Sequence, residues 1–170
     1  MAEVLPDVLA PNLKIVFCGT AAGNESARQK AYYAHPGNKF WRTLHQIGLT
    51  PRQLAPAEFP SVLEYGIGLT DLAKFVSGND DQLRSADFDI LALEKKIAQF
   101  QPHALAFTSK NAGSIFYRSK KLQIGRQPEQ FETTTVFVLP SPSGLAIRSW
   151  DIRWWQEAAE FAGTFIDDVR

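Results

Sequence analysis

The chain has almost no cysteine. Cys18 is the only one in 170 residues, so no disulfide can form within the chain. The same count excludes a zinc site built from cysteines and an iron–sulfur cluster. The three histidines, His35, His45 and His103, have no spacing typical of metal ligands. A single cysteine fits a reducing compartment, and we expect a cytoplasmic protein.

The chain also lacks an excess of charge of either sign and any long apolar run. Lys and Arg together number 18, as do Asp and Glu. No overall field therefore attracts nucleic acid or a membrane. Residues 1–11 do not resemble a signal peptide, and no run has the length of a membrane span, so we expect no membrane partner. We also expect a monomer. A nucleic-acid binder with this charge balance would need a local basic patch. Seven basic residues of the C-terminal half could form one, or they could be scattered over the surface as separate solvated charges: Lys110, Arg118, Lys120, Lys121, Arg126, Arg148 and Arg153.

Short apolar runs alternate with helical patterns, which predicts an α/β sandwich with a mostly parallel sheet. We expect residues 1–12 to form a loosely held arm and residues 13–170 to form one domain. The last helix should present Trp150, Trp154, Ala158, Phe161 and Phe165 on one face. The predicted strands are 15–18, 66–70, 104–108 and 134–139, and the other predicted helices are 38–48, 57–65, 90–100 and 111–121.

Two bent loops follow predicted strands. Residues 19–23 (GTAAG) follow the first strand, and residues 139–145 (LPSPSGL) follow the last. Ligands of parallel sheets bind beyond the carboxyl ends of the strands, so these loops and Asp71 predict one shared site. The glycines of the first loop allow a ligand to approach the backbone, although a tight strand–helix turn would use the same residues. The loop matches neither the P-loop nor the dinucleotide-binding pattern.

Residues 16–41, continuing to residue 50, resemble the first motif of the mismatch-specific uracil-DNA and thymine-DNA glycosylases, most distinctively at 35–41 (HPGNKFW). Residues 139–145 resemble the second motif, and the resemblance extends from about Leu9 to the last helix. It implies a three-layer fold with a four-stranded parallel sheet. It also implies base excision repair without a metal or organic cofactor, by hydrolysis of the N-glycosidic bond of uracil or another deaminated or mismatched base in DNA. A flavodoxin-like small-molecule binder is a remote alternative.

The resemblance also implies roles for individual residues. The first loop would face the edge of the base, and Tyr33 would stack on the flipped base. Leu145 would fill the vacated space in the duplex as an apolar wedge. Arg148 is a candidate phosphate or guanine contact, although the spacing after Leu145 differs from that of the family. The expected base-binding residues are Thr20, Ala21, Ala22, Gly23, Tyr33 and His35, and the expected DNA-binding residues are Lys110, Ser141, Ser143, Gly144, Leu145 and Arg148.

Two positions depart from the family pattern. The family usually has an Asn that holds the attacking water where this chain has Ala21, and a second Asn where it has Ser141. Alanine has no polar side-chain atom, and serine is too short to replace a carboxamide. Either another residue catalyses, or the protein binds lesions or abasic sites without catalysing.

Asp71 and Asn38 are the candidate catalytic residues. Asp71 lies where family members often have Lys or Asn. With its ordinary pKa of about 3.9 it would be ionised, and could activate water and stabilise a cationic sugar. The alternative is a cap for a helix starting at Leu72. Asn38 resembles a catalytic Asn in a related family that acts on hypoxanthine, yet it also lies where a helix begins, and we favour capping.

Overall fold

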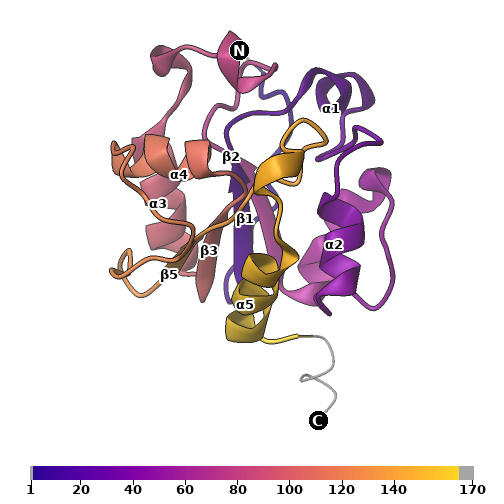
Figure 1. Ribbon diagram of the computed structural model, residues 1–170, viewed down its shortest axis with the longest axis vertical. Helices are drawn as coiled ribbons and strands as arrows, with labels where there is room; N and C mark the ends of the chain where they lie inside the picture. Colours follow the sequence, from indigo (N-terminus) through magenta and orange to yellow (C-terminus); the bar gives the residue numbers. More distant parts are fainter. Residues whose placement is uncertain (1, 165–170) are drawn as a thin grey trace.

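The computed structural model describes residues 2–164, which form a five-stranded sheet covered by helices on both faces (Figure 1). The strand order is β2-β1-β3-β5-β4, and only β4 is antiparallel to its neighbour. The predicted three-layer α/β fold is therefore confirmed, with one more strand than expected. The extra strand has two residues, too few to produce a sequence pattern. The strands are β1 Ile15–Gly19, β2 Ile67–Asp71, β3 Ala104–Phe107, β4 Gly125–Arg126 and β5 Thr135–Val138.

The helices lie mostly where apolar periodicity predicts them. Between residues 2 and 164, none is long and apolar enough to cross a membrane. The α-helices are α1 Asn24–Gln29, α2 Phe40–Gln46, α3 Ile90–Phe100, α4 Lys110–Tyr117 and α5 Ile152–Ala162. The 3₁₀ helices are η1 Pro56–Tyr65, η2 Asp80–Gln82, η3 Ser85–Asp87 and η4 Ile147–Ser149. Helix α1 was not expected, and α4 is shorter than predicted.

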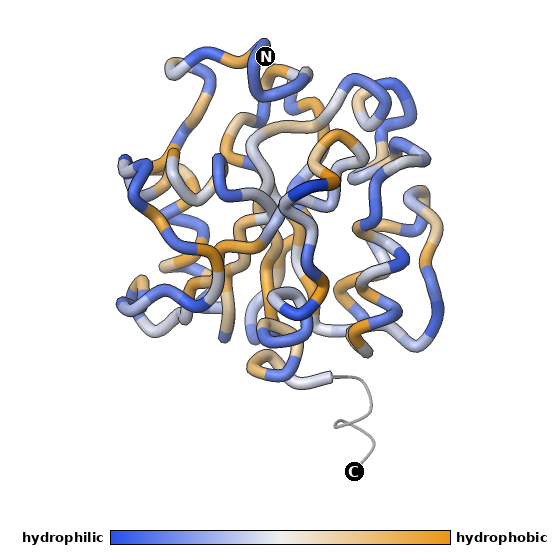
Figure 2. Tube along the Cα trace, viewed as in Figure 1, coloured by the Kyte–Doolittle hydropathy of each residue, from blue (hydrophilic) through white to orange (hydrophobic). Residues whose placement is uncertain are grey.

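Each strand of the parallel sheet is buried on both faces. Figure 2 shows that hydrophobic residues gather along the central strands. Successive side chains of a strand point to opposite faces. Phe17 therefore packs with Phe40 of α2 and Trp155 of α5 on one face. Cys18 belongs to the second core, on the face covered by α3 and α4. Burial on both faces explains why the strands read as continuous apolar runs.

The buried face of α5 differs from the predicted one. Trp155 is completely buried and its Nε1–H donates to the Pro140 carbonyl at 2.9 Å, whereas Trp154 is 37% exposed. Trp150 precedes the helix, because the side chain of Asp151 caps its first turn. With tryptophan at both 154 and 155, the sequence alone left the phase of the helix ambiguous by one residue. Ala158 is buried as predicted, and Phe165 lies outside the described residues.

The segment before β1 is packed against the sheet, in contrast to the loose arm that we expected. Leu5 and Val8 are buried, and Val8 exchanges backbone hydrogen bonds with Leu69 of β2 at 2.9 Å. Asp7 forms ion pairs with Lys74 and Lys96. Residues 2–12 therefore cover one side of β2.

Gly68 provides a test of this packing. A Cβ at Gly68 would lie 2.8 Å from the Val8 carbonyl oxygen and from Leu13 Cδ1. We expect Gly68→Ala to displace the N-terminal segment and lower the free energy of unfolding by about 1–3 kcal/mol, measured by urea denaturation. Gly23→Ala is the control, because a Cβ there meets no atom within 4 Å. Equal stability of both variants would contradict this packing.

Candidate functional site

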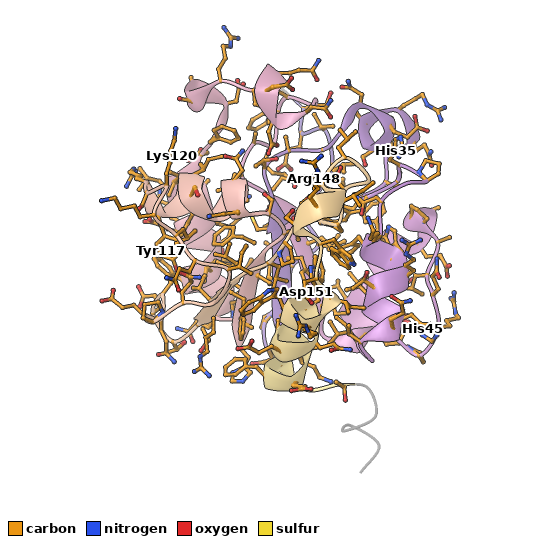
Figure 3. The ribbon with its side chains drawn as sticks, viewed as in Figure 1. His35, His45, Tyr117, Lys120, Arg148 and Asp151 are labelled. Carbon is orange, nitrogen blue, oxygen red and sulfur yellow. The ribbon has the colours of Figure 1, made fainter. Side chains whose placement is uncertain are left out.

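The second bent loop, residues 139–145, is in direct contact with the segment of residues 35–41. The Lys39 N–H donates to the Pro142 carbonyl at 2.8 Å. Gly144 lies so close to Gly37 that a Cβ on it would be 3.1 Å from the Gly37 carbonyl oxygen. Figure 3 shows His35 of the segment 35–41 and Arg148 of η4, which follows the second loop, in the upper part of the same view. Segments separated by a hundred residues thus meet at one edge of the sheet.

The first loop presents unpaired backbone donors. The carbonyl oxygens of Thr20 and Ala22 accept hydrogen bonds from the backbone of residues 73–78. The N–H groups of Thr20, Ala21 and Gly23 donate to no other group between residues 2 and 164. Such groups are suited to bind the carbonyl oxygens of a ligand.

Asp80 fixes this loop from outside, a role that the sequence pattern did not reveal. The Thr20 hydroxyl donates to Asp80 Oδ1 at 2.6 Å, and Asn111 Nδ2 donates to Asp80 Oδ2 at 2.8 Å. One carboxylate thus joins the first loop to the start of α4. This restraint pre-organises the loop, which reduces the cost of ordering it around a ligand.

Three side-chain oxygens converge where β1 ends. Gly19 lies opposite Asp71 in the parallel register of β1 and β2. A Cβ on Gly19 would be 2.8 Å from Asp71 Oδ1 and 3.4 Å from both the Tyr33 hydroxyl and Thr108 Oγ1. The last two oxygens are hydrogen-bonded to each other at 3.1 Å. Only glycine leaves room for this polar cluster, which contains the predicted residues Tyr33 and Asp71.

Asp71 is 6% exposed, and this burial raises its pKa to about 7. The charge of Lys74 acts in the opposite direction, and the charge of Asp7 adds to the rise. The expectation that Asp71 is fully ionised at neutral pH is therefore wrong, because desolvation penalises the carboxylate. A carboxyl group with this pKa exists in both protonation states near pH 7, which suits a proton acceptor.

The structure also separates the capping alternatives. No helix starts at Leu72, whose N–H instead donates to the Gly19 carbonyl at 2.9 Å, so Asp71 is not a helix cap. Asn38 Oδ1 accepts the N–H of Phe40, the first residue of α2, at 2.9 Å, although the N-cap position of that helix is Lys39. This bond gives Asn38 a structural role at the start of α2, whereas Asp71 has no helix to cap.

Tyr33 and His35 occupy different surroundings. Tyr33 has a left-handed backbone, with φ of 52°, and one face of its ring stacks on Phe40 at 3.9 Å. Burial raises the pKa of the Tyr33 hydroxyl well above its ordinary value, so this group stays neutral. His35 is exposed, and its Nδ1 accepts the Gly37 N–H at 2.9 Å, which stabilises the bend. The structure thus brings Tyr33, but not His35, to the polar cluster.

The second loop ends in an exposed apolar turn. Leu145 is 84% exposed and Ile147 is 70% exposed. The turn is held by Ser143 Oγ, which accepts the Leu145 N–H, and by Ser141 Oγ, which accepts the Ser143 N–H, both at 3.2 Å. Sequence reasoning missed Ile147, although the altered spacing after Leu145 was a signal. Such apolar exposure on a fixed turn is typical of a contact surface.

Basic side chains lie beside this edge of the sheet. Arg148 follows Ile147 directly in η4 and is exposed, and Lys110 is exposed at the start of α4. A surface hollow of about 510 Å³ runs along α4 and is lined by Lys110, Arg118 and Lys120, among others. These residues provide a local basic surface despite the zero net charge. No cluster of three or more metal-ligating side chains occurs in the described part of the chain.

Comparisons with known proteins bear on the family and the fold. A sequence model of the Uracil DNA glycosylase superfamily matches residues 6–160. The chain is also similar to a candidate uracil DNA glycosylase from Methanosarcina acetivorans whose solution structure was determined by NMR. The two share 24% identity over 93% of this chain and 94% of the other, with a TM-score of 0.65. This structural match shows a shared fold.

The buried carboxyl group should cost stability in a pH-dependent way. Because the pKa of Asp71 is raised to about 7, the folded state favours the protonated carboxyl group. The stability that this form provides is fully present below about pH 4, and it is lost as the pH rises from there through 7. Asp71→Asn should therefore stabilise the protein at pH 8, by on the order of 4 kcal/mol, and much less at pH 4. Urea denaturation at both pH values measures this difference, and a constant difference would contradict it.

Proposed function

This chain belongs to the uracil DNA glycosylase superfamily, and from that membership we propose that it is a monofunctional glycosylase that removes uracil from DNA. Membership supports DNA glycosylase activity in general. The observation that carries the finer proposal is the buried Asp71 carboxyl, with a pKa of about 7, beside the unpaired N–H donors of the first loop. The resemblance of residues 35–41 and 139–145 to the mismatch-specific branch supports a substrate range that includes other deaminated or mismatched bases.

The first loop would stabilise the leaving base. A uracil flipped from the duplex would lie between this loop and the face of the Tyr33 ring opposite Phe40. When the N-glycosidic bond breaks, its electron pair moves onto the base, whose carbonyl oxygens become more negative. The N–H groups of Thr20, Ala21 and Gly23 would donate to these oxygens, and fixed donors aimed at developing charge lower the barrier.

Asp71 would act on the sugar side of the same bond. In its ionised form it accepts a proton from the water that attacks C1′ of the deoxyribose, while its negative charge stabilises the cationic sugar. This role replaces that of the carboxamide missing at Ala21. The products are the free base and an abasic site, and no cofactor takes part.

The exposed turn would hold the DNA open. Leu145 would enter the space left by the flipped base, and Ile147 would contact the neighbouring bases. Arg148 and Lys110 would bind phosphates on either side, which provides the local positive charge that the zero net charge of the chain does not.

Asp71 is the decisive residue to replace. We expect Asp71→Asn to lower the single-turnover rate on a uracil-containing duplex by about 10²–10⁴-fold, with little change in DNA affinity, since the amide cannot accept the proton. Alkali-labile strand breaks measure the rate, and the rate of the wild-type protein should rise with pH through about 7. The exposed Asp81 offers a matched control, Asp81→Asn, with wild-type activity.

Two outcomes would redirect the assignment. Wild-type turnover by Asp71→Asn would exclude Asp71 and make Asn38→Ala the next variant. Tight binding to abasic DNA, without cleavage of uracil, thymine-mismatch, hypoxanthine or xanthine substrates at enzyme excess, would instead indicate a lesion-binding protein. The same substrate panel defines base specificity.

The wedge predicts a difference between duplex and single-stranded substrates. Leu145→Ala should reduce uracil excision from a duplex at least about tenfold. Unstacking the flipped base costs a few kcal/mol, and the variant lacks the side chain that would fill the vacated space and offset this cost. Excision from a single strand should change by less than about threefold, since no paired stack must be opened. Leu91→Ala, at a 63% exposed leucine of α3, is the control. Equal losses on both substrates would show that Leu145 is not a wedge.

A further inference from the structure

Asp7 forms the centre of a partly buried charge cluster beside the site. Its Oδ1 lies 2.8 Å from Lys74 Nζ and accepts the Thr70 hydroxyl at 2.6 Å, while its Oδ2 lies 2.7 Å from Lys96 Nζ. The Lys74 side chain is only 6% exposed, and its Nζ also donates to the Tyr32 hydroxyl at 3.1 Å. The cluster joins four separate parts of the chain: the N-terminal segment, β2, the turn after β2 and α3.

The cluster surrounds Asp71 along the chain. Thr70 precedes Asp71, and Lys74 follows it by three residues, so Asp7 contacts side chains on both sides of the proposed proton acceptor along the chain. The charges of Lys74 and Lys96 act to lower the pKa of Asp71, and the charge of Asp7 acts to raise it, in addition to the larger effect of burial. The two lysines are thus electrostatically within reach of Asp71, yet their ion pairs are with Asp7.

We propose that Asp7 is a positioning residue for Asp71: it holds Lys74 and Lys96 in its own ion pairs, so that neither lysine neutralises Asp71. The proposal rests on the proposed function, in which Asp71 is the proton acceptor. An ion pair with a lysine would occupy an oxygen of Asp71 and make it a weaker base. Asp7 therefore preserves the basicity of Asp71 from the far side of β2.

The other titratable groups around Asp71 do not compete with this arrangement. Burial raises the pKa values of Cys18, Tyr32 and Tyr33 above their ordinary values, and the charge of Asp71 adds to each rise. All three groups therefore stay neutral across the pH range in which Asp71 titrates. Asp7, Lys74 and Lys96 are the charged groups whose removal should change the pKa of Asp71. Removal of Asp7 should lower this pKa, and removal of either lysine should raise it.

The test is the titration of Asp71 itself, followed by ¹³C NMR of its carboxyl carbon, whose signal is assigned by its absence from Asp71→Asn. Asp7→Asn should lower the titration midpoint by about one pH unit, because it removes a nearby negative charge and releases both lysines. Lys96→Met should raise the midpoint. The matched control is Glu58→Gln, which breaks the surface ion pair with Arg52 and should leave the midpoint unchanged.

Opposite shifts of the Asp71 midpoint in Asp7→Asn and Lys96→Met distinguish a positioning role from a purely structural one. Loss of the ion pair destabilises both variants, so a structural effect would have the same sign in both. An unchanged midpoint in Asp7→Asn, or shifts of the same sign in both variants, would overturn the inference. The pH dependence of uracil excision tests the proposed function separately. If the midpoints shift in opposite directions but the acid limb of the rate profile does not follow them, the positioning holds and Asp71 is not the proton acceptor.

Discussion

The parallel pairing of β1 with β2, which places Gly19 opposite Asp71, is the constraint on which the site depends. A register shift by one residue would turn every strand side chain to the other face. It would move side chains such as Phe17 and Cys18 into the opposite core, whose packing they do not fit. The absence of a side chain at Gly19 then leaves room for Asp71, Tyr33 and Thr108 to converge. The chemistry that we propose thus depends on the packing of the sheet.

In this arrangement the requirements of function and of stability conflict. A carboxyl group that is 6% exposed resists ionisation, yet a proton acceptor must ionise. Burial raises the pKa of Asp71 only to about 7, so the protonated and the ionised carboxyl are both populated near neutral pH. Asp7 keeps the neighbouring lysines paired, and the packing of residues 2–12 against β2 makes that possible.

Much of the architecture could be predicted because buried parallel strands are continuous apolar runs, and because their carboxyl ends share one edge. This reasoning placed Asp71 beside Gly19 of the first loop, as the register of β1 and β2 confirms, whereas residues 139–145 contact residues 37–39. It could not predict β4, which is too short for a pattern, or the phase of α5, where Trp154 and Trp155 fit equally well. Nor could it predict the packing of residues 2–12, because Leu5 and Val8 are too few to indicate a buried segment.

By itself, the sequence determined the fold class, the pair of motifs and the absence of a carboxamide at Ala21, because these depend on residue identity and on the order of elements along the chain. Only the tertiary structure decided the raised pKa of Asp71, the hydrogen bond that Asn38 accepts at the start of α2 and the positions of Asp7, Asp80 and Ile147. The physical reason is that desolvation and charge coupling depend on distance in space. The groups that act on Asp71 come from the N-terminal segment, the turn after β2 and α3, which no local pattern connects.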